Sequence, residues 1–240
     1  MEPATTTTVA AATTAPPVPT TTAAAPAPPP TTTCPANLAQ SLSRTDGAAQ
    51  LLTVEAPGAT SSATVTAWTL GGGCWRRARG PFPARIGIAG LRDVRHEGDG
   101  STPTGIFGLG ATMYGTGPDP GVHYAYHRLV CGDYWDEDPT SVQYNQFVPV
   151  GCGSVPSLAG GSEALWKAPV EYASLAVIDY NTDPVVAGRG SGIFLAVAAG
   201  HPTVGCVSLA PGDHNTVMTW LDPAAHPRVV MGTPGEITGF

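Results

Sequence analysis

Cys206 is the residue of this chain best suited to covalent chemistry, because a cysteine thiolate is a strong nucleophile. It follows Gly205, and a residue without a side chain lets backbone amides approach a substrate carbonyl closely. We therefore predict that the amides of Val204, Gly205 and Cys206 form an oxyanion hole beside the thiol. An ordinary turn glycine next to a structural cysteine has the same sequence, so this motif alone leaves both interpretations open.

A general base would have to stand beside this thiol. Residues 191–197 and 200–209 have the pattern of two strands joined by a tight loop rich in Gly and Pro, which predicts a β-hairpin. With the loop centred near His201, Ala196 lies across from Cys206, and opposed β carbons are about 4.5 to 5.5 Å apart. The predicted position of the base is therefore occupied by alanine, which cannot accept a proton.

The histidines offer other candidates for a base. His201 is the candidate substitute, but it stands five residues before the thiol, up to roughly 16 Å away in extended chain. A solvated loop histidine is the simpler interpretation of His201. His123 and His127 belong to another loop and stay open as bases, whereas His214 and His226 are predicted to be surface residues.

Five cysteines are an odd number, which in a secreted protein points to one unpaired thiol. We expect Cys34 to pair with Cys74, because they bracket a hairpin-like stretch, and Cys131 with Cys152, because they bracket the next long loop. Cys206 is then the free one. Sequence alone does not fix the pairing, and a cytosolic chain with five buried thiols is the alternative.

Composition divides the 240 residues into two parts. Residues 1–33 are nearly all Thr, Ala and Pro, which predicts a disordered linker, either a spacer or a dispensable tail. Residues 34–240 are predicted to form one folded domain. We expect a secreted or cell-envelope protein whose signal or anchor this sequence does not show. A net charge of -7 argues against nucleic acid as a partner, and no apolar run is long enough for a transmembrane segment.

The pattern of elements predicts a mainly-β fold with one or two short helices. Short strands are expected within residues 51–91 and at 173–180, 191–199, 206–209 and 228–231. One helix is expected near 162–167. A second is expected after residues 211–213, with Asp213 as its cap. Thirty glycines and twenty-five prolines also favour strands and turns over alternating β and α units.

Several separated segments together resemble the catalytic domain of the L,D-transpeptidases, the YkuD-type family, over nearly all of the expected folded part. The resemblance is more specific than any single motif, because it combines a Gly-Asp-Gly-Ser-Thr-Pro-Thr-Gly segment with a Pro-Thr-Val-Gly-Cys segment. The matching segments are residues 84–87 with 90–91, 97–107, 134–136 with 144–145, 177–181 and 202–209.

This resemblance implies a β-sandwich whose cysteine attacks the peptide bond before the terminal D-alanine of a peptidoglycan stem peptide. A thioacyl enzyme forms, and an amine or water then accepts the acyl group. Such domains use no metal and no cofactor, and penem-type inhibitors can acylate their cysteine. Peptidoglycan stem peptides are therefore the expected partners.

The chain departs from the family at one position. Relatives carry histidine where this chain has Ala196. An unaided thiol has a pKa near 8.5, and loss of a positioned base costs on the order of 10² to 10⁴ in rate. Two hypotheses follow, an acyltransferase with weakened activity or a noncatalytic peptidoglycan-binding protein. Ala196 favours the second hypothesis, and the retained Cys206 favours the first.

Substrate contacts are predicted in the long loop between Cys131 and Cys152 and in its approach, because loops on a β scaffold often cover binding clefts. The candidates are Tyr126, Trp135, Tyr144 and Asn145, together with Thr203 near the thiol. Trp135 and Tyr144 could equally pack the loop.

Two further sets of charged residues have a functional and a structural interpretation. Arg95 or Arg189 could bind a stem carboxylate, or each could be a solvated charge. His96, Glu97 and Asp99 could suggest a metal site, but the Gly-Asp-Gly-Ser spacing favours a turn. We therefore predict no metal there.

Overall fold

The computed structural model describes residues 1, 3–12, 33–154 and 161–240. The chain divides into two units, Met1–Thr32 and Thr33–Phe240, and the second holds all the helices and strands given below. Positions 13–32 of the expected linker lie outside the described residues, so its disorder stays a prediction. The boundary between the units falls where the Thr/Ala/Pro-rich composition ends.

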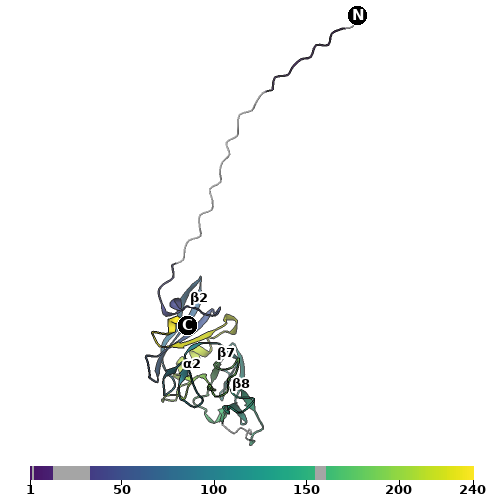
Figure 1. Ribbon diagram of the computed structural model, residues 1–240. Coiled ribbons are helices and arrows are strands. Elements are labelled where there is room, and N and C mark those ends of the chain that lie inside the picture. Colours follow the sequence, from purple (N-terminus) through teal and green to yellow (C-terminus); the bar gives the residue numbers. More distant parts are fainter. Residues whose placement is uncertain (2, 13–32, 155–160) are drawn as a thin grey trace. The chain divides into compact units, whose positions relative to one another are not determined.

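A curled sheet of ten strands forms the body of the folded unit (Figure 1). Its strand order is β6-β15-β1-β2-β3-β14-β13-β12-β7-β8. In chain order, these strands are β1 (Gln50–Glu55), β2 (Ser62–Gly71), β3 (Cys74–Arg85), β6 (Gly105–Phe107), β7 (Leu109–Gly115), β8 (Ala125–Arg128), β12 (Leu175–Ile178), β13 (Phe194–Val197), β14 (Val207–Leu209) and β15 (Arg228–Gly232).

Two small sheets and several short helices complete the unit. One sheet joins β10 (Phe147–Pro149), β9 (Asp133–Asp136) and β11 (Ser162–Ala164), and the other joins β4 (Leu91–Arg92) and β5 (Thr102–Pro103). The α-helices are α1 (Leu38–Ser41) and α2 (Pro211–Met218). Three single turns of 3₁₀ helix are Leu165–Lys167, Pro223–Ala225 and Ile237–Gly239. The prediction of a mainly-β fold with short helices is confirmed.

The central strands are buried on both faces, which explains their unbroken apolar sequences. Every residue of β12 and β13 is buried. Alternate side chains of β13 point to opposite faces of the sheet. Leu195 packs in the core cluster that contains Met218 of α2, whereas Phe194 and Ala196 pack in a second cluster, against which Cys206 lies. Ala196 and the thiol therefore share the face away from α2.

The predicted hairpin around His201 is wrong. Strands β13 and β14 are parallel, and Ala196 pairs with Ser208 rather than with Cys206. The intervening chain forms contacts with a distant segment instead of folding back directly. Thr203 bonds through its backbone to Ile86 and Ile88, at N···O distances of 3.0 and 2.8 Å. These two bonds hold the connecting chain beside residues 86–88. The chain then returns to the start of β13, so that β14 runs in the same direction as β13.

The predicted helices need two corrections. The segment near 162–167 is helical only at Leu165–Lys167, because Ser162–Ala164 pairs with β9 as strand β11. Helix α2 forms as expected, but its N-cap is Ala210 and no side chain caps it. Asp213 lies in the first turn, where its negative charge still suits the helix dipole.

Both predicted disulfides are present, Cys34 with Cys74 and Cys131 with Cys152, and Cys206 is free. Disulfides persist in oxidising compartments, so the pair suggests an extracellular or secreted protein. None of the helices in the described part of the chain has the length and apolar character of a membrane span.

Candidate active site

The thiol of Cys206 lies between the starts of two parallel strands. Cys206 immediately precedes β14, and its Sγ donates a hydrogen bond to the carbonyl oxygen of Gly192, two residues before β13, at 3.3 Å. The residue is partly exposed. Its position is therefore fixed by the parallel pairing of β13 and β14, which the sequence pattern did not reveal.

Gly205 is required by the backbone here. Its φ is +152°, and a Cβ at this position would lie 2.9 Å from Cδ1 of Ile193 and 3.0 Å from the carbonyl oxygen of Ser101. Its amide donates to Oγ1 of Thr203 at 3.2 Å, and that hydroxyl donates to the carbonyl oxygen of Cys206 at 2.6 Å. Thr203 thus closes the turn that presents the thiol. In this state the Gly205 amide is occupied, although the predicted oxyanion hole includes it.

Thr102 connects this turn to the rest of the fold. Its buried Oγ1 donates to the carbonyl oxygen of Gly205 at 2.6 Å and accepts from the amide of Gly87 at 2.9 Å. Thr102 belongs to the Gly-Asp-Gly-Ser-Thr-Pro segment, one of the segments that carry the family resemblance. Its single hydroxyl thus makes hydrogen bonds to two buried backbone groups, the Gly205 carbonyl and the Gly87 amide.

We expect Thr102→Val to lower the free energy of unfolding by about 2 to 3 kcal/mol, because it leaves a buried amide and a buried carbonyl unpaired. Urea unfolding followed by tryptophan fluorescence measures this loss. Thr104→Val is the matched control, since the Thr104 hydroxyl makes only an exposed contact of 3.5 Å with Asp93. Equal losses in the two variants would contradict the assigned role of Thr102.

Cys206 opens onto a cavity of about 670 Å³. Ala196, Val204 and Thr203 line the same cavity, so the residue at the expected base position does face the thiol's surroundings. His201 also lines it. Other side chains in its wall carry charge or hydroxyl groups, and they are Arg95, Glu97, Glu137, Ser162, Glu163, Lys167, Glu171, Tyr172, Ser191 and Ser208.

Carboxylates dominate the electrostatics of this cavity. Burial raises the pKa of the Cys206 thiol to about 12, and the charges of Glu163 and Glu137 add to the effect. The Phe194 amide and the Arg95 charge oppose it without reversing it. The resting thiol is therefore protonated at neutral pH, and far less reactive than the unaided value near 8.5 would make it.

Glu137 and Glu163 were not identified from the sequence. Burial raises the pKa of Glu137 to about 7, helped by the charges of Glu163 and Glu97. Burial also raises the pKa of Glu163, whose Oε1 accepts a hydrogen bond from the hydroxyl of Tyr172 at 2.7 Å. Glu163 lies in β11 and Glu137 directly follows β9, the strand with which β11 pairs. No local motif marks these two residues, because only the pairing of β9 with β11 brings them together.

The aromatic residues predicted to contact substrate do not line this cavity. The indole nitrogen of Trp135 donates to Oδ1 of Asn145 at 3.0 Å, and the amide of Gly192 donates to the same oxygen at 3.0 Å. Trp135 and Asn145 thereby hold the residue whose carbonyl accepts from the thiol. Tyr126 donates to the carbonyl oxygen of Gly117 from β8.

Tyr144 has a similar supporting place. Its hydroxyl donates to Glu97 and accepts from the amide of Gly190 at 3.1 Å. Oε2 of Glu97 also accepts from the hydroxyl of Ser191 at 2.8 Å. These bonds fix the segment before β13. Tyr144 and Trp135 therefore agree with the alternative in which they pack the loop rather than contact substrate.

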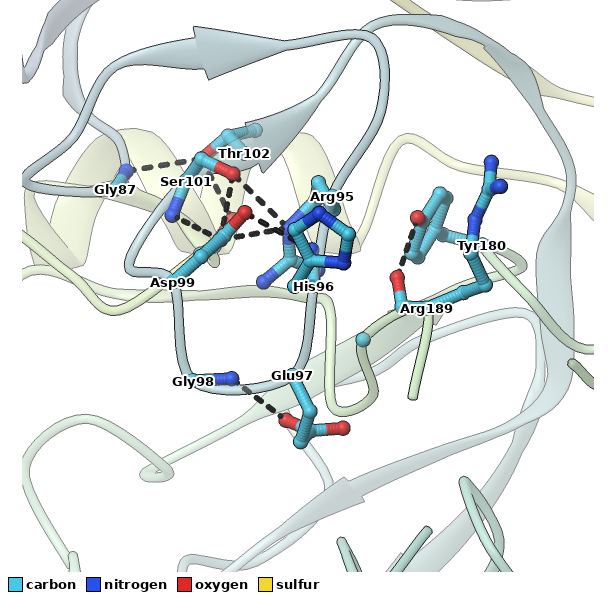
Figure 2. A network of polar contacts seen from close by, with 12 residues as sticks. Gly87, Arg95, His96, Glu97, Gly98, Asp99, Ser101, Thr102, Tyr180 and Arg189 are labelled. Atoms are coloured by element: carbon cyan, nitrogen blue, oxygen red, sulfur yellow. Dashed lines mark hydrogen bonds and ion pairs between the residues drawn. The ribbon is translucent and has the colours of Figure 1, made fainter. Parts of the chain in front are cut away.

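Arg95 is buried, with 2% of its side chain exposed. Its Nε lies 3.3 Å from Oγ of Ser101 and 3.5 Å from Oδ1 of Asp99 (Figure 2). Cζ of its guanidinium lies over the ring of Tyr180, 5.4 Å from the ring centre. The buried Nη1 has no hydrogen-bond partner among the described residues. Arg189 is exposed, and only its carbonyl oxygen takes part in this network, as acceptor from Tyr180.

Asp99 forms the predicted turn. It accepts bonds from the amide and hydroxyl of Ser101 and from the amide of His96 (Figure 2). Burial alone would raise the pKa of Asp99, but these bonds and the charge of Arg95 lower it to about 2. Across residues 33–154 and 161–240, no group of three His, Cys, Asp or Glu side chains is arranged to hold a metal ion.

The histidines are placed in different surroundings. His201 is exposed, with Nε2 3.8 Å from the carboxylate of Glu171. His127 bonds Asp133 at 2.8 Å and does not line the cavity. His226 is exposed, as predicted, and so is His123. The surface prediction for His214 is wrong, because α2 turns this residue inward and leaves it 1% exposed.

No family model, curated protein or solved structure matches this chain.

Proposed function

We propose that this protein is a cysteine acyltransferase of the L,D-transpeptidase type that acts on peptidoglycan stem peptides in the cell envelope. One observation carries the proposal. Of the five cysteines, four form disulfides, and the fifth stands on a turn closed by Thr203 and Thr102, facing a cavity of about 670 Å³. A cavity of this volume is of the size that binds small molecules and peptides.

In the proposed reaction, Sγ of Cys206 attacks the carbonyl carbon of the peptide bond before the terminal D-alanine. A carbon–sulfur bond forms, the carbon–nitrogen bond breaks, and the amine of D-alanine leaves with the proton lost by the thiol. An acceptor amine or water then attacks the thioester. The new carbon–nitrogen or carbon–oxygen bond replaces the carbon–sulfur bond, and the acceptor's proton returns to sulfur.

A second function, noncatalytic binding of peptidoglycan, is favoured by a separate observation. Ala196 stands in the cavity wall where the family carries its base, and the surroundings raise the pKa of Cys206 to about 12. Both features slow the formation of a thiolate. A protein of this kind would keep the cavity and bind stem peptides without turnover.

Intact mass after incubation of the oxidised protein with a carbapenem separates the two functions. We expect an increase of one drug mass in the native chain and none in Cys206→Ser, because every other cysteine is in a disulfide. The absence of any adduct in the native chain, together with an adduct in Ala196→His, would instead establish the noncatalytic function.

A further inference from the structure

The basic residues of this acidic chain are concentrated in one segment. Residues 56–92 contain five of the eleven lysines and arginines and none of the eighteen acidic residues. All five are exposed arginines, and they are Arg76, Arg77, Arg79, Arg85 and Arg92. The segment therefore has a strong positive charge within a protein whose net charge is -7.

Four of these arginines belong to the single strand β3, which pairs with β2 along its length to form a hairpin. Gly72 and Gly73, both at positive φ, form the tight turn between the two strands. At about 3.3 Å per residue, the strand from Arg76 to Arg85 spans up to roughly 30 Å. The four guanidinium groups therefore form a row along the hairpin.

This row of arginines uses both faces of the hairpin. Paired residues of neighbouring strands lie on the same face of a sheet, and successive residues of one strand alternate between the faces. Arg77 and Arg85 pair with even-numbered residues of β2. Arg76 and Arg79 pair with odd-numbered ones, because two register shifts add extra residues to β3. Each face of the hairpin therefore carries two arginines.

The arginines of β3 have no anionic partners among the described residues, whose ion pairs all involve other side chains. Within the same part of the chain, the side chains of Arg76 and Arg77 also make no hydrogen bond. Arg79 donates only to a neighbouring backbone carbonyl, at 2.8 Å, and Arg85 donates to the hydroxyl of Ser62, at 2.8 Å. Like charges in such proximity repel one another, so an external anion would stabilise the hairpin.

Two nearby acidic side chains do not supply this anion. Glu55 stands at the opposite end of β1, five paired positions from the level of Arg76, which is roughly 16 Å along the sheet. Asp222 approaches the near end of β1, where its amide donates to Gln50, but its carboxylate accepts from the amide of Ala224. The guanidinium groups are therefore available to a partner from outside the chain.

We propose that the β2–β3 hairpin binds a linear phosphodiester polymer of the cell envelope, whose successive phosphates pair with the four arginines of β3. A guanidinium group presents a planar fork of N–H donors that matches the oxygens of a phosphate. A flexible linear polymer can follow the row and contact both faces of the hairpin, whereas a planar membrane surface meets one face at a time. The two disulfides suggest an extracellular protein, which favours an envelope polymer over nucleic acid. This surface functions independently of the reaction proposed for Cys206.

Binding of this kind depends strongly on salt, because each phosphate contact releases counterions from the polymer. The logarithm of the affinity falls with the logarithm of the salt concentration, with a slope of about -0.7 per contact for a single strand of nucleic acid. Four contacts at this slope lower the affinity about fiftyfold between 50 and 200 mM NaCl.

Fluorescence anisotropy of end-labelled poly(glycerol phosphate), titrated with the full oxidised chain at several NaCl concentrations, measures the affinity and its salt slope. Native protein and Cys206→Ser should bind the polymer equally. Glycerol 3-phosphate should compete about a hundredfold less well per phosphate than the polymer, because a single phosphate cannot bridge several arginines. The absence of polymer binding by the native chain at 50 mM NaCl would overturn the proposal.

Two double variants with the same change in net charge locate the surface. Arg76→Gln with Arg79→Gln should halve the salt slope, because two of the four contacts are lost. Arg128→Gln with Arg189→Gln is the matched control, since both residues are exposed and lie outside residues 56–92. This control should keep the native slope, and an equal change in both double variants would show that net charge alone determines binding.

The identity of the partner is tested separately. Equal affinity for poly-L-glutamate of the same charge would contradict the choice of phosphate. Binding to phosphatidylglycerol vesicles without binding to the polymer would assign the arginines to a membrane surface instead. A chain that binds the polymer but forms no carbapenem adduct keeps this surface and loses the acyltransferase function, and the converse result removes only the surface.

Discussion

Replacement of Ala196 with histidine is expected to accelerate acylation of Cys206 by a carbapenem on the order of 10²- to 10⁴-fold. Ala196 lies in β13 on the same face of the sheet as the thiol, and both line the cavity, so an imidazole at this position enters the space next to Sγ. The imidazole would accept the thiol proton and, once protonated, oppose the charges of Glu137 and Glu163. Stopped-flow measurement, or mass measurement after quenched flow, gives the rate of acylation.

Ala199→His is the control for this variant, because Ala199 lines the same cavity from beyond the end of β13. The Ala199→His variant adds the same imidazole to the cavity, but from a position that has a different register relative to Cys206. Acceleration by histidine at 196 and not at 199 supports a specific base position. Equal rates in Ala196→His and the native chain would show that position 196 is not where a base acts in this fold.

The buried His214 is expected to make the fold sensitive to mild acid. Burial lowers its pKa from 6.5 to about 4, although the carbonyl oxygen of Leu195 accepts a hydrogen bond from its ring. The unfolded chain therefore binds a proton between pH 6.5 and 4 that the folded chain does not. Stability is fully present above pH 6.5, and about 3 kcal/mol is lost as the pH falls through this window to 4.

Urea unfolding of native protein and His214→Gln at pH 7 and pH 4 measures this contribution as a difference. Glu137 acts in the opposite sense, because its pKa is raised to about 7 and its stability contribution declines as the pH rises from about 4.5 to 7. The comparison of two chains cancels that effect. The exposed His226→Gln should behave as the native chain does, and the same acid loss in His214→Gln would rule out the assignment to His214.

Residue types and short-range patterns were sufficient to predict much of this fold. Strands β1 to β3, β12 and β15 correspond to predicted β segments, and both disulfides followed from the segments that they bracket. The free thiol followed by elimination. These features depend on local apolar pattern and on the number of cysteines, which the sequence displays directly.

The arrangement around the thiol could not be predicted, because distant segments determine it. The sequence from β13 to β14 has the local character of a hairpin, but hydrogen bonds from Thr203 to residues 86–88 make the strands parallel. The inward orientation of His214 depends on the packing of α2 against β13 and β14. Glu137 and Glu163 meet only because β9 pairs with β11. The spacing of residues along the sequence does not indicate these pairings.

The disulfide between Cys34 and Cys74 has a mechanical consequence for the folded unit. It closes residues 34–74, which include α1, β1 and β2, into a covalent loop. A pulling force applied at the two chain ends passes from Cys34 through sulfur directly to Cys74 at the start of β3. The enclosed strands cannot be stretched end to end while the bond is intact. Tension would have to separate β3 from β14 or peel away later strands, so the segment from Cys34 to Cys74 is shielded from load.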